Sequence, residues 1–315
     1  MDQLCLTQAA LKLTNLFVLV TNRCNLSCKH CYVSSSPNGE FGLTAQAIIN
    51  SAIAFANAFG RQRLTLSGGE ILSRQDILPH LQFLAEFHNI YLLTNGTLIN
   101  KSIACQLRDL PVSFRFGIDG GTAHTHDFMR GSGAFERMIH GLSLLLQNGI
   151  SSQRIEVFFT ATPDNISEIP LLLELAEQYQ IPRLIIEPVA VHGRAMEFWS
   201  KTLPLGKDTF RIEFQKTIDQ LSHSPYANVW KWHPLREDFS TLTIYYDGRV
   251  FPYTPIDLLD EEYGLLGNIK NTSLSELLDL NEIKCRALLK AMRYLRSSGS
   301  TSGPFGFVRQ NYSYI

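Results

Sequence analysis

The chain has 315 residues, with 28 Lys and Arg against 29 Asp and Glu, for a formal net charge of −1. A chain of this length buries a large core and has room for one α/β domain with a smaller appendage. Its balanced charge provides no broad attraction to nucleic acid or to an anionic membrane surface. A small molecule or a peptide is therefore the expected partner.

The first residues lack the basic start, the long apolar stretch and the cleavage site of a signal peptide, and the apolar run at residues 16–20 is too short to span a bilayer. The sequence therefore predicts a cytoplasmic protein whose six cysteines are reduced. In such a compartment, clustered cysteines indicate metal binding or catalysis rather than disulfides.

From about residue 15 to about residue 190, short β-rich runs alternate with amphipathic stretches, which predicts βα units around a parallel sheet. Six strands are expected, at residues 16–21, 63–67, 90–94, 112–118, 154–160 and 183–188. The expected helices lie at residues 44–59, 75–87, 98–108, 134–148 and 165–179. Thr44 and Asn165 are the N-cap candidates of the first and last of these helices.

Unusual residues follow the first four of these strands. They are a group of cysteines after the first strand, Gly68-Gly69-Glu70 after the second, Asn95-Gly96 after the third and Asp119-Gly120 after the fourth. Ligands of parallel sheets bind beyond the carboxyl ends of the strands, where these loops converge. The sequence therefore places its candidate site at that edge of the sheet.

Beyond residue 200 the pattern changes. An amphipathic run at 206–221 precedes two β-rich runs, at 242–246 and 249–251, which flank Asp247-Gly248 and predict a tight hairpin. Residues 273–296 are expected to be helical, and residues 297–303 form a Ser/Gly-rich, flexible tail. We expect an N-terminal segment at 1–14, a main domain at 15–205 and a C-terminal extension at 206–315.

The cysteines after the first strand are Cys24, Cys28 and Cys31, a C-x3-C-x2-C arrangement within eight residues. One such loop can place three thiolates around a single metal centre. Structural zinc normally takes four protein ligands, whereas a 4Fe-4S cluster held by three cysteines leaves one iron open. The alternatives are a zinc site that recruits His30 and three incidental buried cysteines.

The run from Thr21 to Tyr32 resembles the signature loop of the radical S-adenosylmethionine (SAM) superfamily, with His30 at a position that the family usually fills with an aromatic ring. The resemblance continues through four further stretches: Leu66 to Glu70, Leu93 to Gly96, Ile118 to Gly121 with Arg130 to Phe135, and Gly193 to Ala195. It implies a partial (β/α)6 barrel with a small α+β C-terminal extension.

The resemblance also implies two cofactors, one 4Fe-4S cluster and SAM. In the family, the amino and carboxylate groups of SAM chelate the open iron, the reduced cluster breaks the C5′–S bond, and the resulting radical takes a hydrogen atom from a substrate. It implies cluster ligands and SAM-binding residues as follows: Cys24, Cys28 and Cys31 for the cluster, and Gly68, Gly69, Glu70, Asn95, Asp119 and Arg130 for SAM.

Several of these residues have simpler interpretations. Asn95-Gly96 is also a common turn, and Arg130 could be a solvated loop arginine. The family commonly has a serine where this chain has Gly117, so one hydroxyl contact to SAM is missing. His124 and His126 could transfer protons or bind substrate, although exposed loop histidines without a catalytic role are commoner.

Glu156 and Glu187 interrupt apolar strand runs, so each could point into the barrel as a general base. The alternative is a carboxylate that faces water or bonds to backbone.

Residues 246–253, Gly267 to Ile269 and the helical run at 273–280 resemble the start of a SPASM domain, the cysteine-rich extension of peptide-modifying radical SAM enzymes. Tyr253 stands where that domain has a cysteine, only Cys285 follows, and Cys5 and Cys105 lie elsewhere. The resemblance therefore implies an extension without an auxiliary cluster. Epimerisation, or a rearrangement, elimination or coupling that returns its electron to the single cluster, is compatible with this loss.

The resulting functional hypothesis is a cytoplasmic radical SAM enzyme that acts on a peptide or peptide-like natural-product precursor, reduced by a protein such as flavodoxin or ferredoxin. An enzyme of the same class acting on a sugar, a nucleoside or another small metabolite is the alternative. A catalytically silent scaffold is a third possibility, disfavoured by the complete cysteine set and Gly68-Gly69-Glu70.

Overall fold

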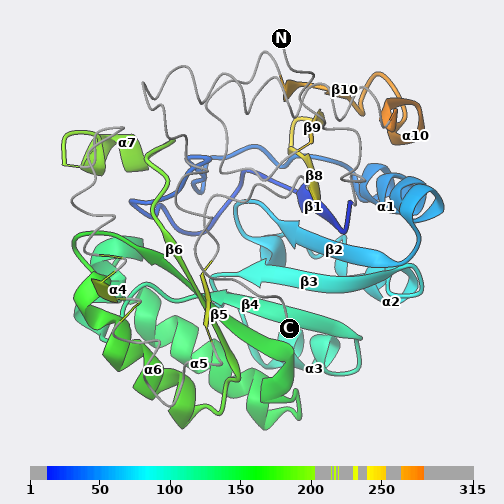
Figure 1. The fold of residues 1–315 in the computed structure, drawn as a ribbon. Helices are drawn as coiled ribbons and strands as arrows, with labels where there is room; N and C mark the ends of the chain where they lie inside the picture. The colour runs from blue at the N-terminus through cyan, green and yellow to red at the C-terminus, as the bar shows by residue number, and fades with distance from the viewer. Residues whose placement is uncertain are drawn as a thin grey trace.

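A computed structural model describes residues 13–202, 240–252 and 264–279, together with residues 214, 216, 217 and 219 and the strand at 230–232. The described strands form one twisted sheet with helices packed against it (Figure 1). The strand order is β10-β9-β8-β1-β2-β3-β4-β5-β6-β7. No helix in this part of the chain is both long enough and apolar enough to cross a membrane.

The six expected strands are confirmed to within two residues at each end. They are β1 (Asn15–Leu19), β2 (Gln62–Ser67), β3 (His88–Thr94), β4 (Val112–Gly117), β5 (Ile155–Ala161) and β6 (Arg183–Pro188), each parallel to the next. Parallel neighbours joined by helical crossovers place every strand's carboxyl end at one edge. The α/β partial-barrel expectation is therefore confirmed.

Four of the five expected helices are present, as α1 (Ala45–Phe59), α3 (Lys101–Arg108), α5 (Ala134–Gln147) and α6 (Ile169–Gln178). The Thr44 side chain caps α1 by accepting a hydrogen bond from the Ala47 amide at 3.1 Å. The run at 75–87 instead forms a 3-10 turn (Leu78–His80) and the short helix α2 (Leu81–Leu84). Two of the described helices were not separately expected, α4 (Ala123–Arg130) and α7 (Ala195–Trp199), whereas α10 (Leu274–Leu277) lies in the run at 273–296 that is expected to be helical.

Asn165 is not the N-cap of a helix. It precedes a 3-10 turn (Ile166–Glu168), and its side-chain oxygen accepts a hydrogen bond from the Thr162 amide at 2.7 Å. Its Nδ2 group donates to the carbonyl oxygens of Asp119 at 3.0 Å and Thr160 at 2.9 Å. The side chain therefore ties the ends of β4 and β5 together.

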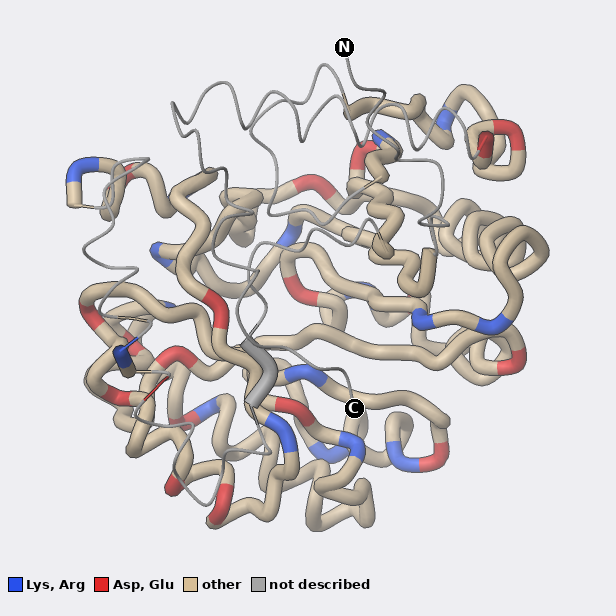
Figure 2. Tube along the Cα trace, in the orientation of Figure 1, with Lys and Arg blue, Asp and Glu red and all other residues tan. Residues whose placement is uncertain are grey.

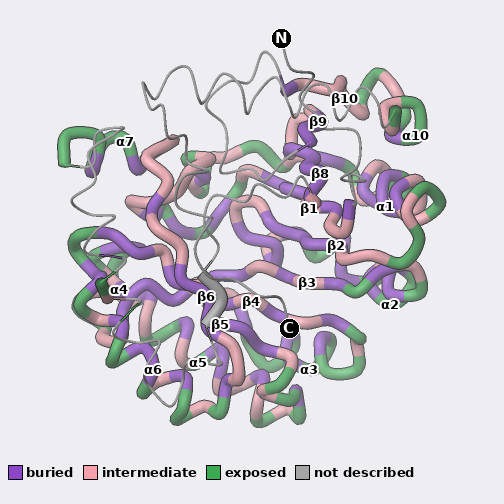
Figure 3. The backbone as a smooth tube through the Cα atoms, in the orientation of Figure 1, coloured by how far each residue is buried: buried purple, intermediate pink, exposed green. Residues whose placement is uncertain are grey.

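The core lies between the sheet and its helices. Alternate residues of the parallel strands are fully buried on one face, as the pattern of β4 shows, where Val112, Phe114 and Phe116 are buried and the residues between them are half-buried (Figure 3). The half-buried face carries polar side chains, including Asn15, which accepts a hydrogen bond from Thr65. This period of two gives the strands an apolar side toward the helices and a mixed side toward the barrel interior.

The predicted hairpin around Asp247-Gly248 is confirmed. Strand β8 (Thr241–Ile244) pairs antiparallel with β9 (Arg249–Phe251), which in turn pairs with β10 (Gly267–Asn268). Strand β8 also pairs in parallel with β1, and β7 (Trp230–Trp232) pairs with β6, so residues beyond the six expected strands extend the same sheet.

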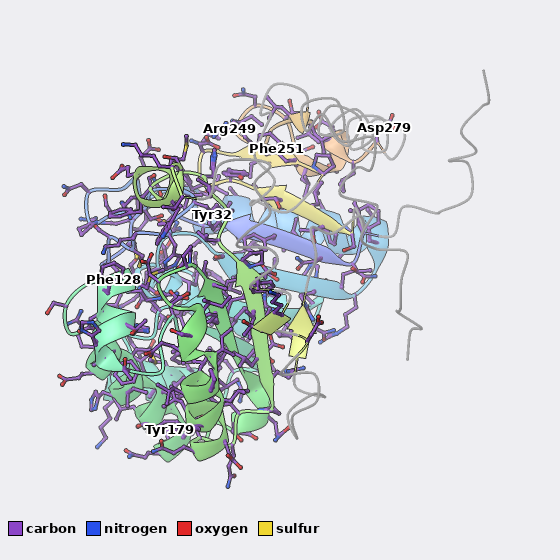
Figure 4. The ribbon with its side chains drawn as sticks, turned by 60° about the vertical axis from the view of Figure 1, so that its left-hand side comes forward. Tyr32, Phe128, Tyr179, Arg249, Phe251 and Asp279 are labelled. Carbon is purple, nitrogen blue, oxygen red and sulfur yellow. The ribbon has the colours of Figure 1, made fainter. Side chains whose placement is uncertain are left out.

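The hairpin packs against the cysteine loop. Tyr245 and Phe251 form a buried cluster with Leu19, and the half-buried Tyr32 packs against it. Figure 4 shows Tyr32 and Phe251 with their side chains. Cys5, Tyr253 and Cys285, as well as most of the runs expected at 206–221 and 273–296, lie outside the described residues.

Candidate cluster and cofactor site

The loops that follow β1, β2 and β3 are hydrogen-bonded to one another. The amide of Gly69 donates to the Thr21 carbonyl at 2.8 Å, and the amide of Glu70 donates to the Arg23 carbonyl at 3.0 Å. The amide of Asn95 donates to Glu70 Oε2 at 2.8 Å. The convergence that the strand order predicted is therefore present.

Gly68 and Gly69 allow this close approach. A Cβ at Gly68 would lie 2.3 Å from the Thr21 carbonyl oxygen, and one at Gly69 would lie 2.1 Å from that of Arg23. Gly68 also has a φ of +132°, in the region that favours glycine. The two glycines therefore allow the loop after β2 to contact the cysteine loop.

The three cysteines occupy a small, largely buried pocket of the loop. Cys24 and Cys28 are buried beside Leu26 and Ala134, and Cys31 packs partly buried against them. The sulfur of Cys24 accepts hydrogen bonds from the Leu26 amide at 3.4 Å and from Asn95 Nδ2 at 3.7 Å. Donors of this kind stabilise metal-bound thiolates and tune the metal that they hold.

Burial makes the thiols of Cys24 and Cys28 poor acids. Burial is the largest cause that raises the pKa of Cys24 to about 12, with a further contribution from the Glu70 carboxylate. Burial likewise raises the pKa of Cys28 to about 11, although the nearby Arg130 guanidinium opposes the shift. Because a thiolate is the metal ligand, metal binding has to release these protons.

The donor set fits a cluster better than a single ion. Across the described ranges, no three His, Cys, Asp or Glu side chains converge as ligands of one metal ion. A cubane binds each cysteine to a different iron and needs no such convergence. Three sulfur donors on one buried loop, with amide donors beside them, suit a 4Fe-4S cluster.

Glu70 is fully engaged within the protein. Its Oε1 accepts hydrogen bonds from the Leu72 amide at 3.0 Å and the Thr94 hydroxyl at 2.6 Å, and its Oε2 accepts from the Asn95 amide. Burial raises the pKa of this carboxyl, while those donors favour its charged form. The Glu70 carboxylate therefore holds the loops after β2 and β3 together, and its part in binding SAM stays a prediction.

Asn95 is likewise a bridge rather than an open ligand. Its Nδ2 group donates to Asn25 Oδ1 at 3.0 Å as well as to the Cys24 sulfur, and its Oδ1 accepts from the Thr97 amide at 2.9 Å. The side chain stabilises its own turn and also contacts the cysteine loop, and its role as a SAM ligand stays a prediction.

Asp119 and Arg130 form a buried ion pair next to the cysteines. Arg130 Nε lies 2.6 Å from Asp119 Oδ2, and the other carboxylate oxygen accepts from the Thr160 amide at 2.8 Å. Burial opposes ionisation of Asp119, but Arg130 and His30 together hold its pKa below the usual range. Arg130 is thus a buried cation and not a solvated loop residue.

The guanidinium of Arg130 occupies the space that Gly117 leaves open. A Cβ at Gly117 would lie 2.3 Å from Arg130 Nη2. At this position, where the family commonly has a serine, the chain therefore presents a cation to the barrel interior. The positive charge of Arg130 also opposes the rise in the pKa of Cys28 and of Glu70 that burial causes.

The three histidines of this region have different environments. His30 is next to Asp119, with Nε2 3.4 Å from Oδ2, and burial lowers its pKa to about 4. His126 is buried, contrary to the exposed placement that loop histidines usually have, and its Nδ1 accepts from the Asp119 amide at 3.3 Å. Burial lowers the pKa of His126 to about 3. His124 is exposed.

Glu156 does not belong to the site, which corrects its expected role as a general base. It is the second residue of β5, at the opposite end of the strand from the loops described above. Its carboxylate forms ion pairs with Arg115 at 2.9 Å and Arg183 at 3.0 Å. Four residues of strand separate it from Thr160 at the site, about 13 Å.

Glu156→Gln is therefore expected to leave SAM cleavage unchanged while lowering the free energy of unfolding by about 3 kcal/mol, because two arginines lose their buried counter-charge. Urea denaturation and an assay for 5′-deoxyadenosine check the two halves of this prediction. Loss of SAM cleavage in a folded Glu156→Gln protein would restore the glutamate to the site.

Glu187 lies near the carboxyl end of its strand, at the edge of the sheet that carries the cysteine loop. It is the fifth residue of β6, directly across from Thr160 in the β5–β6 register. The half-buried carboxylate also contributes to raising the pKa of Tyr32, after burial and Cys31, so it lies near the end of the cysteine loop. The structure thus separates the two glutamates that the sequence treats alike.

Three sulfur donors, a glycine-rich loop and a buried cation at the open edge of a partial barrel are typical of proteins that bind an iron-sulfur cluster together with a small ligand carrying a carboxylate. The family profile described as "Radical SAM superfamily" matches residues 18–176. The chain therefore belongs to the radical SAM superfamily, whose cofactors are a 4Fe-4S cluster and SAM.

Among curated proteins, the chain is 31% identical over 193 residues to Fe-coproporphyrin III synthase of Methanosarcina barkeri, which covers 59% of this chain and 46% of the relative. It is 28% identical over 189 residues to mycofactocin maturase MftC of Mycobacterium ulcerans, covering 59% and 50%. The chain spans about half the length of these relatives.

Among solved structures, the chain resembles Streptococcus suis SuiB bound to its precursor peptide SuiA. The TM-score is 0.66 at 15% identity, and the match covers 87% of this chain and 66% of SuiB. At this identity the likeness concerns the fold alone.

Proposed function

We propose that this chain binds one 4Fe-4S cluster through Cys24, Cys28 and Cys31 and uses it to cleave SAM reductively and abstract hydrogen from a peptide or peptide-like natural-product precursor. The observation that carries the proposal is the hydrogen-bonded convergence of the cysteine loop with the loops after β2 and β3, beside the Asp119–Arg130 pair.

Within this proposal, the residues around the cluster divide into two groups. The carbonyls of Gly68 and Gly69 bind the cationic ammonium group of the methionyl part of SAM, and the guanidinium of Arg130 binds its anionic carboxylate. Glu70, Asn95 and Asp119 hold these groups in place through the contacts described above. Glu187 is the remaining general-base candidate because it lies at the same edge.

The proposal of a peptide substrate is supported by the fold shared with SuiB, which has been solved with its precursor peptide, and by the similarity to a mycofactocin maturase. The hairpin of β8 and β9 also lies where the sequence resembles the start of a SPASM domain. We infer a main domain at 15–205 and an extension at 206–315. We also infer a cytoplasmic location and a cluster that is reduced by flavodoxin or ferredoxin.

A small metabolite is the second candidate substrate. Its support is the similarity to Fe-coproporphyrin III synthase, whose name concerns a porphyrin and not a peptide. A silent scaffold is disfavoured because all three cysteines are present and the sulfur of the buried Cys24 accepts two hydrogen bonds.

Anaerobic reconstitution tests the proposal. The purified protein is expected to bind about four iron and four sulfide per chain and, with SAM and a strong reductant, to form 5′-deoxyadenosine. No 5′-deoxyadenosine from a fully loaded protein would reject the activity. Stimulation by precursor peptides, compared with sugars, nucleosides and porphyrins, then separates the two substrate classes.

A further inference from the structure

The segment after β6 is attached to the cysteine loop by Arg194. Its Nη1 group donates to the Cys28 carbonyl at 2.7 Å, and its Nη2 group donates to the Ser35 carbonyl at 2.7 Å. Its backbone amide donates to the Cys31 carbonyl at 3.0 Å. Arg194 therefore contacts the cysteine loop on both sides of Cys31, although it lies more than 150 positions away from Ser35 in the sequence.

Gly193 makes this attachment possible. Its φ is +57°, and a Cβ would lie 2.2 Å from the Tyr32 carbonyl oxygen and 2.7 Å from that of Cys31. Only a residue without a side chain allows the two backbones to approach so closely. The contact is therefore built from both Gly193 and Arg194.

The guanidinium also places a permanent charge at the loop. In the described part of the chain, both of its Nη groups donate to carbonyl oxygens and not to carboxylates, so no ion pair offsets the charge there. The other arginine beside the cysteines, Arg130, is by contrast paired with Asp119.

We propose that Arg194 is a positioning residue of the cluster, with two separable effects: it fixes the loop that carries the cysteines, and it raises the reduction potential of the cluster. The inference rests on the proposed ligands Cys24, Cys28 and Cys31.

Both effects follow from the contacts of Arg194. Hydrogen bonds from a charged donor to both sides of Cys31 oppose the loop opening by which a chelator removes iron. An electron added to the cluster is stabilised by a nearby positive charge, because cluster potentials depend on local charge and hydrogen bonding. Arginine keeps that charge at every accessible pH.

The test compares Arg194→Lys with Arg194→Gln in the reconstituted full chain. Lysine keeps the charge but cannot reach both carbonyls with a planar fork, whereas glutamine loses the charge as well. The readouts are the rate of iron loss to a chelator and the midpoint potential from an EPR-monitored titration without SAM. Arg154→Gln is the matched control, because Arg154 also donates to backbone carbonyls, those of Arg108, Leu110 and Val112, but beside the amino end of β4.

Both Arg194 variants are expected to lose iron about tenfold faster than the wild type or Arg154→Gln. Only Arg194→Gln should shift the potential to more negative values. An unchanged rate in Arg194→Lys would overturn the positioning role, and an unchanged potential in Arg194→Gln would overturn the electrostatic one. If Arg194→Gln does not fold, Gly193→Ala replaces it. Faster iron loss at a wild-type midpoint potential in Gly193→Ala supports two separable effects, and an unchanged rate of iron loss overturns the positioning role. A wild-type chain that binds no cluster would instead reject the proposed ligands.

Discussion

Alanine at Cys24, Cys28 or Cys31 is expected to abolish cluster retention and with it the formation of 5′-deoxyadenosine. Each cysteine is the ligand of one iron in the proposed cubane, so its loss leaves a second iron open and the cluster labile. Iron and sulfide analysis after reconstitution, together with the visible absorbance of the cluster, measures the effect. The expected loss of activity is at least a hundredfold, because no other group in the site supplies the electron.

Cys105→Ala is the matched control for these variants. Cys105 is exposed on α3, and its sulfur lies 3.4 Å from Asn148 Oδ1, away from the cysteine loop. It should bind wild-type amounts of iron. Unchanged iron in all three loop variants, or equal loss in Cys105→Ala, would contradict the assignment of the ligands.

Arg130→Gln is expected to weaken SAM binding by at least tenfold and to lower the free energy of unfolding by about 3 kcal/mol at pH 7. The first effect follows from the loss of a charge-assisted bond to the ligand carboxylate. The second follows because Asp119 is left buried without its counter-charge. Calorimetry with SAM on the reconstituted protein and urea denaturation measure the two effects separately.

The pH dependence of this variant has a definite sign. In the wild type, the pKa of Asp119 lies below its usual 3.8, so its stabilising contribution is complete above that pH and is lost as the pH falls through the lower, folded value. Without Arg130, burial makes the charged form of Asp119 costly. The difference in free energy of unfolding between the wild type and Arg130→Gln should therefore grow from pH 4 to pH 7. A deficit that is larger at pH 4 would contradict the ion-pair explanation.

The double variant Asp119→Asn with Arg130→Gln separates stability from ligand binding. Removing both charges should restore part of the free energy of unfolding, because no unpaired carboxylate remains buried. It should not restore SAM affinity. Recovery of SAM binding in the double variant would show that Arg130 acts only through Asp119.

Most of the fold was predictable from local patterns. Alternation of β-rich and amphipathic runs located all six strands, and Thr44 marked the start of α1 through its capping side chain. The run at 75–87 does not form the single helix that its pattern predicts. Pro79 and the turn around it favour i to i+3 hydrogen bonds, as in the bond from the His80 amide to the Ile77 carbonyl. The pairing of β8 with β1 joins distant segments, so no local pattern reveals it.

The site was predictable as a set of loops but not as a set of contacts. Spacing predicts the cysteines as ligands, and the strand ends predict Glu70 and Asn95 beside them, yet only the folded chain shows that three donors hold the Glu70 carboxylate. Glu156 and Glu187 look alike in sequence because each interrupts an apolar strand. Their positions at opposite ends of their strands depend on where each strand begins.

Acidic and basic residues are interspersed along the described chain (Figure 2). Next to the cysteines, by contrast, two cations lie close together with them, Arg130 and Arg194. Net charge gives no sign of such a local concentration, because it averages over the whole chain.

The central place of β1 in the sheet has a consequence for the order of events during synthesis. The strand and the cysteine loop leave the ribosome before β8, and β1 pairs on one side with β2 and on the other with β8, which is made more than 200 residues later. Until then β1 is an edge strand, open to pairing with other chains, and the loop lacks the cover of Tyr245 and Phe251. A nascent chain is therefore most exposed to aggregation and to premature oxidation of its thiols in this interval, and cluster loading belongs after residue 251 has folded into place.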